Sequence, residues 1–164
     1  VVAVAASMNH SLALRSDGTV WTWGRGGSGL SALPVQMQGL SGVVAVAAGV
    51  YHSMALRSDG TVWTWGSNYY GQLGDGTTSN RTLPVQVQGL SGVVAMAAGY
   101  NHSMAVRSDG TVWAWGSNYY GQLGDGTTSG RTLPVQVQGV SGAVAVAAGA
   151  SHSMAVRSDG TGWG

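Results

Sequence analysis

A repeat of 50 residues constrains the fold of this chain more than any other feature of its 164-residue sequence. The unit from Val43 to Gly92 is followed by a nearly identical copy from Val93 to Gly142. Residues 1–42 form a shortened unit, and residues 143–164 form a partial one. Repeats of this length build solenoids, propellers or arrays, in which each unit buries its apolar face against its neighbours. We therefore treat residues 1–164 as a single segment of stacked units.

The first unit is shorter than the others because one of its connections has lost residues. Gly24 and Pro34 lie ten positions apart, whereas the equivalent Gly66 and Pro84 lie eighteen positions apart. The connection at 24–29 is rich in Gly, which invites comparison with a phosphate-binding loop. That loop requires Gly-Lys-Ser/Thr, and the chain contains no Lys. We therefore interpret this stretch as a shortened connection.

Each full unit is predicted to contain four strands. Residues 43–48 form an apolar run with no polar face, which is typical of a strand buried on both sides. Over residues 52–57, His, Met and Leu alternate with Ser, Ala and Arg. Residues 61–65 are β-branched and aromatic, as strands prefer. A weaker fourth strand is expected to begin at Pro84, where Val and Gln alternate over 85–88. A proline at its start favours an edge position for this strand.

The Asp59-Gly60 pair between the second and third predicted strands is a strong hairpin signal. We expect a type I′ turn there, because that turn needs positive φ at both central residues. A helical alternative rests on the Ala, Met and Leu content, but Gly49 and Asp59-Gly60 interrupt it. Four short strands in each unit indicate propeller blades. The sequence thus predicts an all-β β-propeller of four-stranded blades, with about 3.3 to 4 blades in this chain.

The composition excludes several functional classes. The absence of Cys excludes a disulfide scaffold, a thiolate nucleophile and a zinc–cysteine site. Seven Arg against six Asp leave a net charge of +1, so no basic surface for nucleic acid is expected. No apolar run approaches the roughly 20 residues of a membrane span. No targeting motif is present, and a chain without Cys fits any compartment.

The titratable residues recur at equivalent positions, which favours structural roles over catalytic ones. The histidines could in principle form a ring that holds a metal, but each lies in a His-Ser pair that serves the repeat. One set of aspartates belongs to the hairpin turns, and the other lies in Leu-Gly-Asp-Gly-Thr-Thr loops that match no EF-hand. These residues are His10, His52, His102 and His152; Asp17, Asp59, Asp109 and Asp159; and Asp75 and Asp125. We expect no enzyme activity, metal or cofactor, because no acid pair or nucleophile elbow is present.

Aromatic and amide side chains in the loops are the candidate binding residues. An Asn-Tyr-Tyr sequence follows the Trp-rich strand of each full unit, and further tyrosines occupy variable positions just before two of the histidines. Tyr and Asn, together with Gly and Ser, are typical of adaptable protein-binding surfaces. We expect one tyrosine of each Tyr-Tyr pair to pack and the other to be exposed. The candidates are Tyr51, Asn68, Tyr69, Tyr70, Tyr100, Asn118, Tyr119 and Tyr120.

The repeated motifs resemble the regulator of chromosome condensation repeat. The resemblance rests on VAAG, His-Ser-Met-Ala-Leu, Asp-Gly-Thr-Val-Trp-Thr-Trp-Gly and Leu-Pro-Val-Gln-Val, and above all on WG-x-N-x-x-GQLG at 65–74 and 115–124. It covers essentially the whole chain. It implies a β-propeller, usually of seven blades, that serves as a binding scaffold. Some members act as nucleotide-exchange factors for a small GTPase, and the near-identical units without Lys look more like the bacterial branch.

An open arc of blades would leave apolar faces and strand edges exposed, so the ring needs completion. The chain could be part of a longer protein, which Val1 in place of Met and the end at Gly164 favour. Two chains could instead close a ring of about seven or eight blades, or four compact blades could close alone. Our main expectation is a non-catalytic scaffold that binds proteins, including a second copy of itself. A purely structural repeat is the alternative, and a carbohydrate-binding or enzymatic propeller has the least support.

Overall fold

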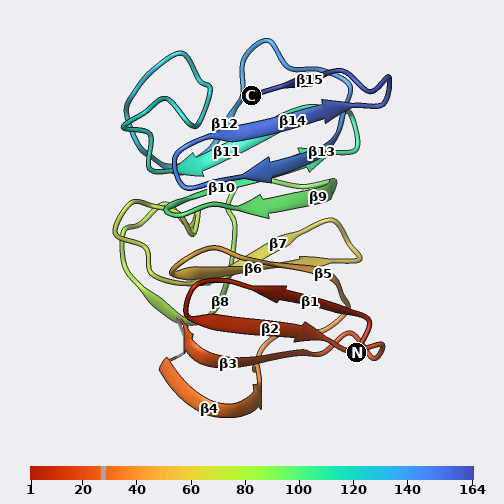
Figure 1. The fold of residues 1–164 in the computed structure, drawn as a ribbon, viewed down its shortest axis with the longest axis vertical. Coiled ribbons are helices and arrows are strands. Elements are labelled where there is room, and N and C mark those ends of the chain that lie inside the picture. Colours follow the sequence, from red (N-terminus) through yellow and green to blue (C-terminus); the bar gives the residue numbers. More distant parts are fainter. Residues whose placement is uncertain (27–28) are drawn as a thin grey trace.

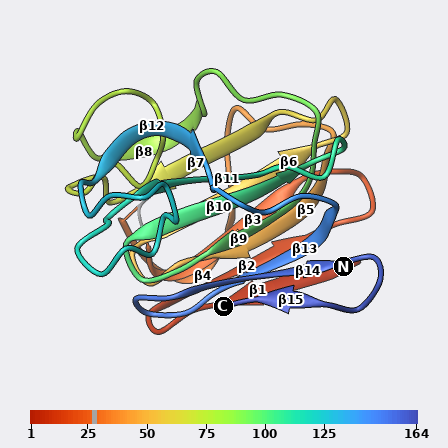
Figure 2. The same cartoon turned by 90° about the horizontal axis from the view of Figure 1, so that it is seen from above.

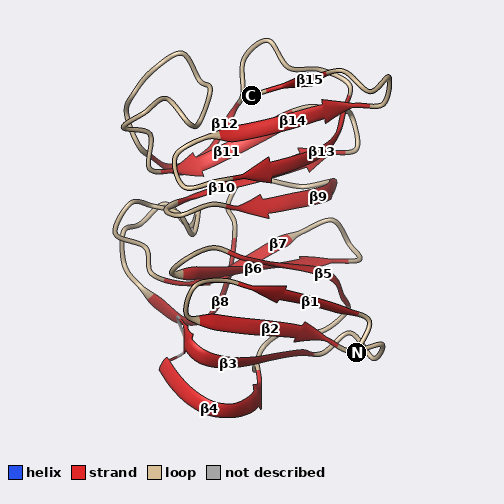
Figure 3. Cartoon of the chain, viewed as in Figure 1, coloured by secondary structure: helices blue, strands red, loops and turns tan. Residues whose placement is uncertain are grey.

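The structure, a computed structural model, describes residues 1–26 and 29–164, so Gly27 and Ser28 of the shortened connection lie outside the described residues. This part of the chain contains only strands and loops (Figure 3). The strands form four antiparallel sheets, three with four strands and one with three. No helix in these two ranges is long and apolar enough to cross a bilayer. The predicted all-β, incomplete propeller is confirmed.

Each sheet is a meander in which strands follow one another in sequence order, and we call the sheets blades 1 to 4. Blade 1 contains β1 (Ala3–Ala6), β2 (His10–Leu14), β3 (Val20–Gly26) and β4 (Gly29–Gln36). Blade 2 contains β5 (Val43–Ala48), β6 (His52–Arg57), β7 (Val62–Gly66) and β8 (Arg81–Gln86). Blade 3 contains β9 (Val93–Ala98), β10 (His102–Arg107), β11 (Val112–Gly116) and β12 (Arg131–Gln136). Blade 4 contains β13 (Ala143–Ala148), β14 (Ser153–Arg157) and β15 (Gly162–Trp163).

The four blades stack in chain order, with the two termini at opposite ends of the stack (Figure 1). Seen from above, the sheets overlie one another, and the long loops of blades 2 and 3 project on one side (Figure 2). The first strands of successive blades, β1, β5, β9 and β13, contact one another along the stack. These strands therefore form the inner edge of the arc, and the fourth strands form its outer edge.

The apolar core lies between blades, not within any one of them. At the second interface, Met54, Leu56 and Val62 of blade 2 pack against Ala105 and Trp115 of blade 3. The same residue types meet at the first and third interfaces. Trp65 and Trp115 are fully buried. Burying an indole removes about 150–250 Å² from water, so these tryptophans are major contributors to blade stacking.

The hairpin between the second and third strands differs from the predicted type I′ turn. Gly60 has φ of 81°, but no residue other than Gly has positive φ in the described chain, so Asp59 is not left-handed. The backbone bonds from Gly60 N to Arg57 O and from Arg57 N to Thr61 O, both 3.0 Å, close a three-residue loop. Such loops combine a type I turn with a left-handed glycine. The Asp59 carboxylate stabilises this alternative by accepting bonds from the Thr61 backbone and hydroxyl.

The inner and outer strands also differ from expectation. Strand β5 is not buried on both sides, because Val44 is 55% exposed and most of the strand is only partly buried. An inner-edge strand pairs with one neighbour only, which leaves its other side open. The outer strand β8 begins at Arg81 and not at Pro84, so the proline lies inside the strand. Pro84 is tolerated there because β8 is an edge strand, whose outward N–H needs no partner.

Candidate functional site

Asn68 and Asn118, two of the predicted binding residues, are buried and organise the long loops. The Asn68 amide donates to Ser79 O at 3.0 Å and to Thr77 O at 3.0 Å, and its Oδ1 accepts from Leu73 N at 3.0 Å. Asn118 makes the equivalent bonds one repeat later. These side chains hold the loop in shape and do not reach the surface.

The loop aspartates, Asp75 and Asp125, are bound by residues of the loops in which they lie. Asp75 accepts from the Thr77 backbone N–H at 3.0 Å and from its hydroxyl at 2.7 Å, as expected for an Asx turn. The Arg81 guanidinium lies 2.9 Å from the Asp75 carboxylate, whose side chain is only 5% exposed. Asp125 is held in the same way by Thr127 and Arg131, and these hydrogen bonds outweigh burial and lower its pKa to about 2. A carboxylate so engaged is not free to act as a general acid or base.

Three of the four predicted His-Ser pairs connect neighbouring blades. His10, His52 and His102 each place Nε2 within 2.8–3.0 Å of the serine hydroxyl of the next blade. Burial lowers the pKa of His52 to about 3 and that of His102 to about 4. In the described chain, no group of three His, Cys, Asp or Glu side chains could hold a metal ion. His10, His52 and His102 therefore link neighbouring blades as neutral hydrogen-bonding groups.

The predicted binding tyrosines gather on the side of the stack that carries the long loops. The rings of Tyr51 and Tyr100 meet edge to face at 5.5 Å between centroids, and their hydroxyls lie 3.3 Å apart. The rings of Tyr70 and Tyr119 meet in the same geometry at 6.2 Å. Each pair bridges blades 2 and 3. Of the two Tyr-Tyr sequences, Tyr69, Tyr119 and Tyr120 are more than 70% exposed, whereas Tyr70 is 40% exposed. The expected split into one packed and one exposed tyrosine thus holds in blade 2 only, where Tyr70 packs partly.

Four of these tyrosines surround a hollow of about 350 Å³. Tyr70, Tyr100, Tyr119 and Tyr120 line it together with Asn101 and Ser151, and no lining residue is charged. We call this hollow and its four lining tyrosines the tyrosine face (Tyr70, Tyr100, Tyr119 and Tyr120). The hydrogen bond to Tyr51 raises the pKa of the Tyr100 phenol above its usual value, so the Tyr100 hydroxyl stays protonated. The face offers aromatic area and neutral hydrogen-bonding groups.

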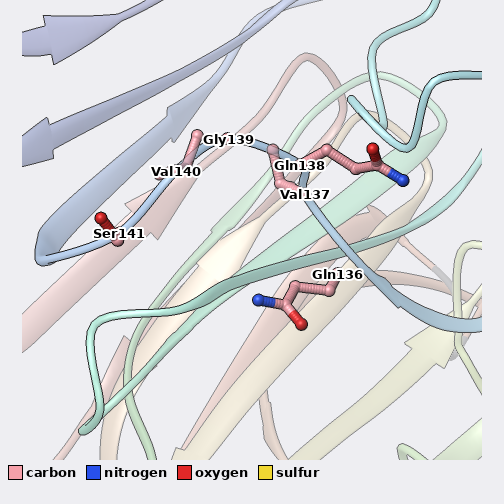
Figure 4. Close-up of a pocket in the computed structure, with 6 residues that line it drawn as sticks. All are labelled: Gln136, Val137, Gln138, Gly139, Val140 and Ser141. Carbon is pink, nitrogen blue, oxygen red and sulfur yellow. The ribbon is translucent and has the colours of Figure 1, made fainter.

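A second hollow, of about 510 Å³, lies against the connection that follows β12. Its lining residues form one continuous segment from Gln136 to Ser141 and include no titratable side chain (Figure 4). Gln136 and Gln138 extend away from each other in this view. The hollow therefore has no converging groups that could perform chemistry.

The family model described as the RCC1-like domain matches residues 1–164. The chain belongs to the RCC1-like domain family. This agrees with the resemblance carried by the repeated WG-x-N-x-x-GQLG motif, while the comparisons do not address a bacterial subgroup. A comparison of the RCC1-like chain with curated protein sequences finds no match.

Solved structures place the RCC1-like chain among propellers. It is 27% identical to yeast RCC1 (Prp20) in a complex with Kap60, with a TM-score of 0.84 over 98% of this chain and 42% of that one. A structure of Prp20p from Saccharomyces cerevisiae, studied with its binding to Gsp1p and histones, gives 27% identity and a TM-score of 0.83, covering 98% and 44%. The chain thus spans less than half the length of these relatives. The computationally designed Ika4 protein shares the fold at 21% identity and a TM-score of 0.59, covering 98% and 86%.

Sequence reasoning missed how the RCC1-like blades bring tyrosines together. Tyr51 directly precedes His52, but Tyr100 stands two positions before His102. Only this offset of one residue, combined with the stacking of the blades, places the two hydroxyls within 3.3 Å of each other. The signal in the sequence was that both tyrosines break the near-identity of the repeats.

Proposed function

We propose that this RCC1-like chain is a non-catalytic scaffold that binds another protein through its tyrosine face. The observation that carries the proposal is the clustering of four tyrosines around a hollow without charged lining residues. Tyr is a frequent hot-spot residue, since it combines a large apolar area with a polar end. The Prp20 structures concern a protein that binds other proteins, namely Kap60, Gsp1p and histones.

The aspartates and the interior histidines are already engaged in hydrogen bonds or ion pairs, which supports the non-catalytic part of the proposal. The hairpin aspartates each accept two bonds from a threonine two residues later, and the loop aspartates are paired with arginines. The interior histidines are neutral and buried between blades. Catalysis by general acids and bases needs a free group near the reacting atoms.

Affinity capture with the purified chain tests the tyrosine face. We expect Tyr70→Ala and Tyr120→Ala, which line the hollow, to lower the affinity for a captured and purified partner by tenfold or more, as hot-spot truncations do. Tyr69→Ala is the matched control, because Tyr69 is 74% exposed but does not line the hollow. Equal effects of all three variants, or none, would contradict a site at the hollow.

The proposal includes closure of the ring by a second copy of the chain. At the first end of the stack, no other blade covers the Trp side of blade 1 among the described residues; Trp23 is half-buried there and Val4 is 72% exposed. At the other end, Met154 and Val156 of blade 4 are 45% and 41% exposed. These are the residue types that meet at the interior interfaces. Two copies joined head to tail would therefore repeat the existing packing and supply eight blades.

The hydrogen-bonding groups at the two ends of the stack are complementary as well. His152 of blade 4 is exposed and, within residues 1–26 and 29–164, has no serine partner from a following blade, in contrast to the buried His52 and His102. Ser11 of blade 1 occupies the position of Ser53 but has no histidine from a preceding blade among the described residues. A head-to-tail joint would bring His152 of one copy to Ser11 of the next.

The mass in solution tests self-association. We expect a species of twice the 16.6 kDa chain mass, measured by sedimentation equilibrium over a range of concentrations. Val4→Asp and Met154→Asp should each convert it to the single-chain mass, because they place a charge in the joint. A species of 16.6 kDa at all concentrations would overturn homo-association and leave the tyrosine face to be judged by its own experiment.

A further inference from the structure

Tyr51 of blade 2 and Tyr100 of blade 3 form a hydrogen-bonded pair on the surface of the stack, although they lie 49 positions apart in the sequence. We propose that this pair is a site of oxidative cross-linking, at which a one-electron oxidant joins the two phenol rings through a carbon–carbon bond. This inference goes beyond the proposed protein-binding role, because the reaction takes place within one chain and needs no bound protein.

The two phenol rings are already placed for coupling. Their hydroxyl oxygens lie 3.3 Å apart, and their ring centroids lie 5.5 Å apart with 83° between the ring planes. This edge-to-face contact is one of the arrangements that aromatic pairs prefer. Phenoxyl radicals couple at the ring carbons next to the oxygen. Because the two hydroxyls are neighbours, the ring carbons that would react in Tyr51 and Tyr100 are brought close together.

The backbone segments that carry the two tyrosines are joined to each other. The N–H of Val50, directly before Tyr51, donates to the backbone oxygen of Gly99, directly before Tyr100, at 3.4 Å. This bond connects blade 2 to blade 3 beside the rings. Holding two reactants in position speeds their reaction, because a chance encounter is replaced by a step within one molecule.

Stacking of the blades does not by itself require this pair. The other two interfaces carry different residues at the equivalent positions: Asn9 with Val50 at the first, and Asn101 with Ala150 at the third. An apolar core of the same residue types nevertheless forms at all three interfaces. The hydrogen-bonded phenols are thus a special feature of the interface between blades 2 and 3.

The proposed reaction consumes two equivalents of a one-electron oxidant, the class that haem peroxidases generate from hydrogen peroxide. An oxidant can approach from solvent, since Tyr51 is 42% exposed. Each tyrosine gives one electron to the oxidant and its phenolic proton to solvent, which leaves two phenoxyl radicals. These form one bond between their ortho carbons, and the hydrogens on those carbons move to the two oxygens. The dityrosine product restricts the unfolded chain and therefore stabilises the contact between blades 2 and 3.

Photochemical oxidation with tris(bipyridyl)ruthenium(II) and persulfate, followed by tryptic digestion, tests the site. The chain contains no Lys, so trypsin cleaves it only after Arg. Residues 26–57 then contain Tyr51 as their only tyrosine, and residues 82–107 contain only Tyr100. We expect mass spectrometry to show these two peptides joined, with their summed mass reduced by two hydrogens.

An equal mixture of unlabelled and isotope-labelled chains distinguishes a link within one chain from a link between chains. The expected intrachain product contains two peptides with the same label, whereas an interchain product also contains mixed pairs. Oxidation of the same chain in denaturant should lower the yield of the intrachain link roughly fivefold or more, because the geometry of the pair is then lost.

Conservative substitutions supply the controls. Tyr51→Phe and Tyr100→Phe should each abolish the link, because phenylalanine forms no phenoxyl radical. Tyr69→Phe should leave its yield unchanged, since Tyr69 is 74% exposed and has no close ring partner in the described chain. Circular dichroism verifies folding, and the comparison in denaturant uses the unsubstituted chain should a variant fail to fold. The proposal is overturned if the folded chain gives no intrachain link between these peptides, or if denaturant does not lower the yield.

Discussion

His52 and Ser103 join blades 2 and 3 through a hydrogen bond of 2.8 Å between Nε2 and Oγ. The Ser103 proton is already donated to Gln72 O, so the His52 Nε2–H is the donor. The Nδ1 atom of His52 is then an acceptor, buried against Gly49 with no hydrogen-bond partner in the part of the chain that the structure describes. In blade 1 the equivalent position is Ser7, whose hydroxyl lies 3.0 Å from His10 Nδ1. At this repeat position, glycine thus leaves space for the imidazole, whereas serine forms a hydrogen bond with it.

The close approach at these glycines predicts a strong effect of a single methyl group. A Cβ at Gly99 would lie 2.6 Å from His102 Nδ1 and 2.6 Å from Gly149 O of the next blade. We expect Gly99→Ala to lower the free energy of unfolding by about 2 kcal/mol or more, because two blades must separate to admit it. Chemical denaturation measures the change. Gly130→Ala is the control, since its Cβ meets only Gly116 O at 3.2 Å; equal losses in both variants would contradict the explanation.

The buried histidines predict loss of stability in mild acid. The folded pKa is about 3 for His52 and about 4 for His102, against 6.5 in the unfolded chain. Below pH 6.5 the unfolded chain binds protons that the folded chain does not, so stability falls from pH 6.5 to about 4. Thermal unfolding across this range should show the decline. His52→Gln should make the decline smaller, because only the contribution of His102 then remains of the two. His152→Gln is the control, because His152 is exposed and its replacement leaves both buried imidazoles in place.

A difference between the two long loops predicts a stabilising substitution. In blade 2, Asn80 Oδ1 accepts a bond of 2.8 Å from the backbone N–H of Asn68. Blade 3 has Gly130 at this position, and Asn118 N–H has no matching partner in the described chain. Gly130→Asn should therefore raise the free energy of unfolding by about 0.5–1.5 kcal/mol. The reciprocal Asn80→Gly should lower it by a similar amount, and a loss in both directions would count against the loop assignment.

Two equivalent tryptophans should differ in their contribution to the stability of a single chain. Trp65 is fully buried between blades 1 and 2, whereas Trp23 lies half-buried on the end face of blade 1. Trp65→Ala should cost about 3–5 kcal/mol, and Trp23→Ala should cost less than half as much. Unfolding is measured at protein concentrations at which the chain is a monomer. Comparable losses would indicate that blade 1 is covered even in the single chain.

The sequence by itself determined the repeat, the strand order within each blade and the β-propeller class. These follow from local information: alternating side chains, β-branched and aromatic residues, and Asp-Gly turns that recur with a fixed period. It also indicated that the histidines serve the repeat, because each unit carries one at the same place. Local propensity was less reliable for the turn type, since Asp59 adopts negative φ and its side chain binds Thr61 instead.

The tertiary structure alone decided which residues face solvent and which meet across blades. Asn68 lies in a loop whose sequence predicts solvent exposure, but its amide is buried where the two ends of that loop converge. Tyr51 and Tyr100 meet because adjacent blades stack with an offset. Contacts of this kind depend on the spacing and rotation between sheets. No single unit encodes that relationship, because it arises only when the units pack together.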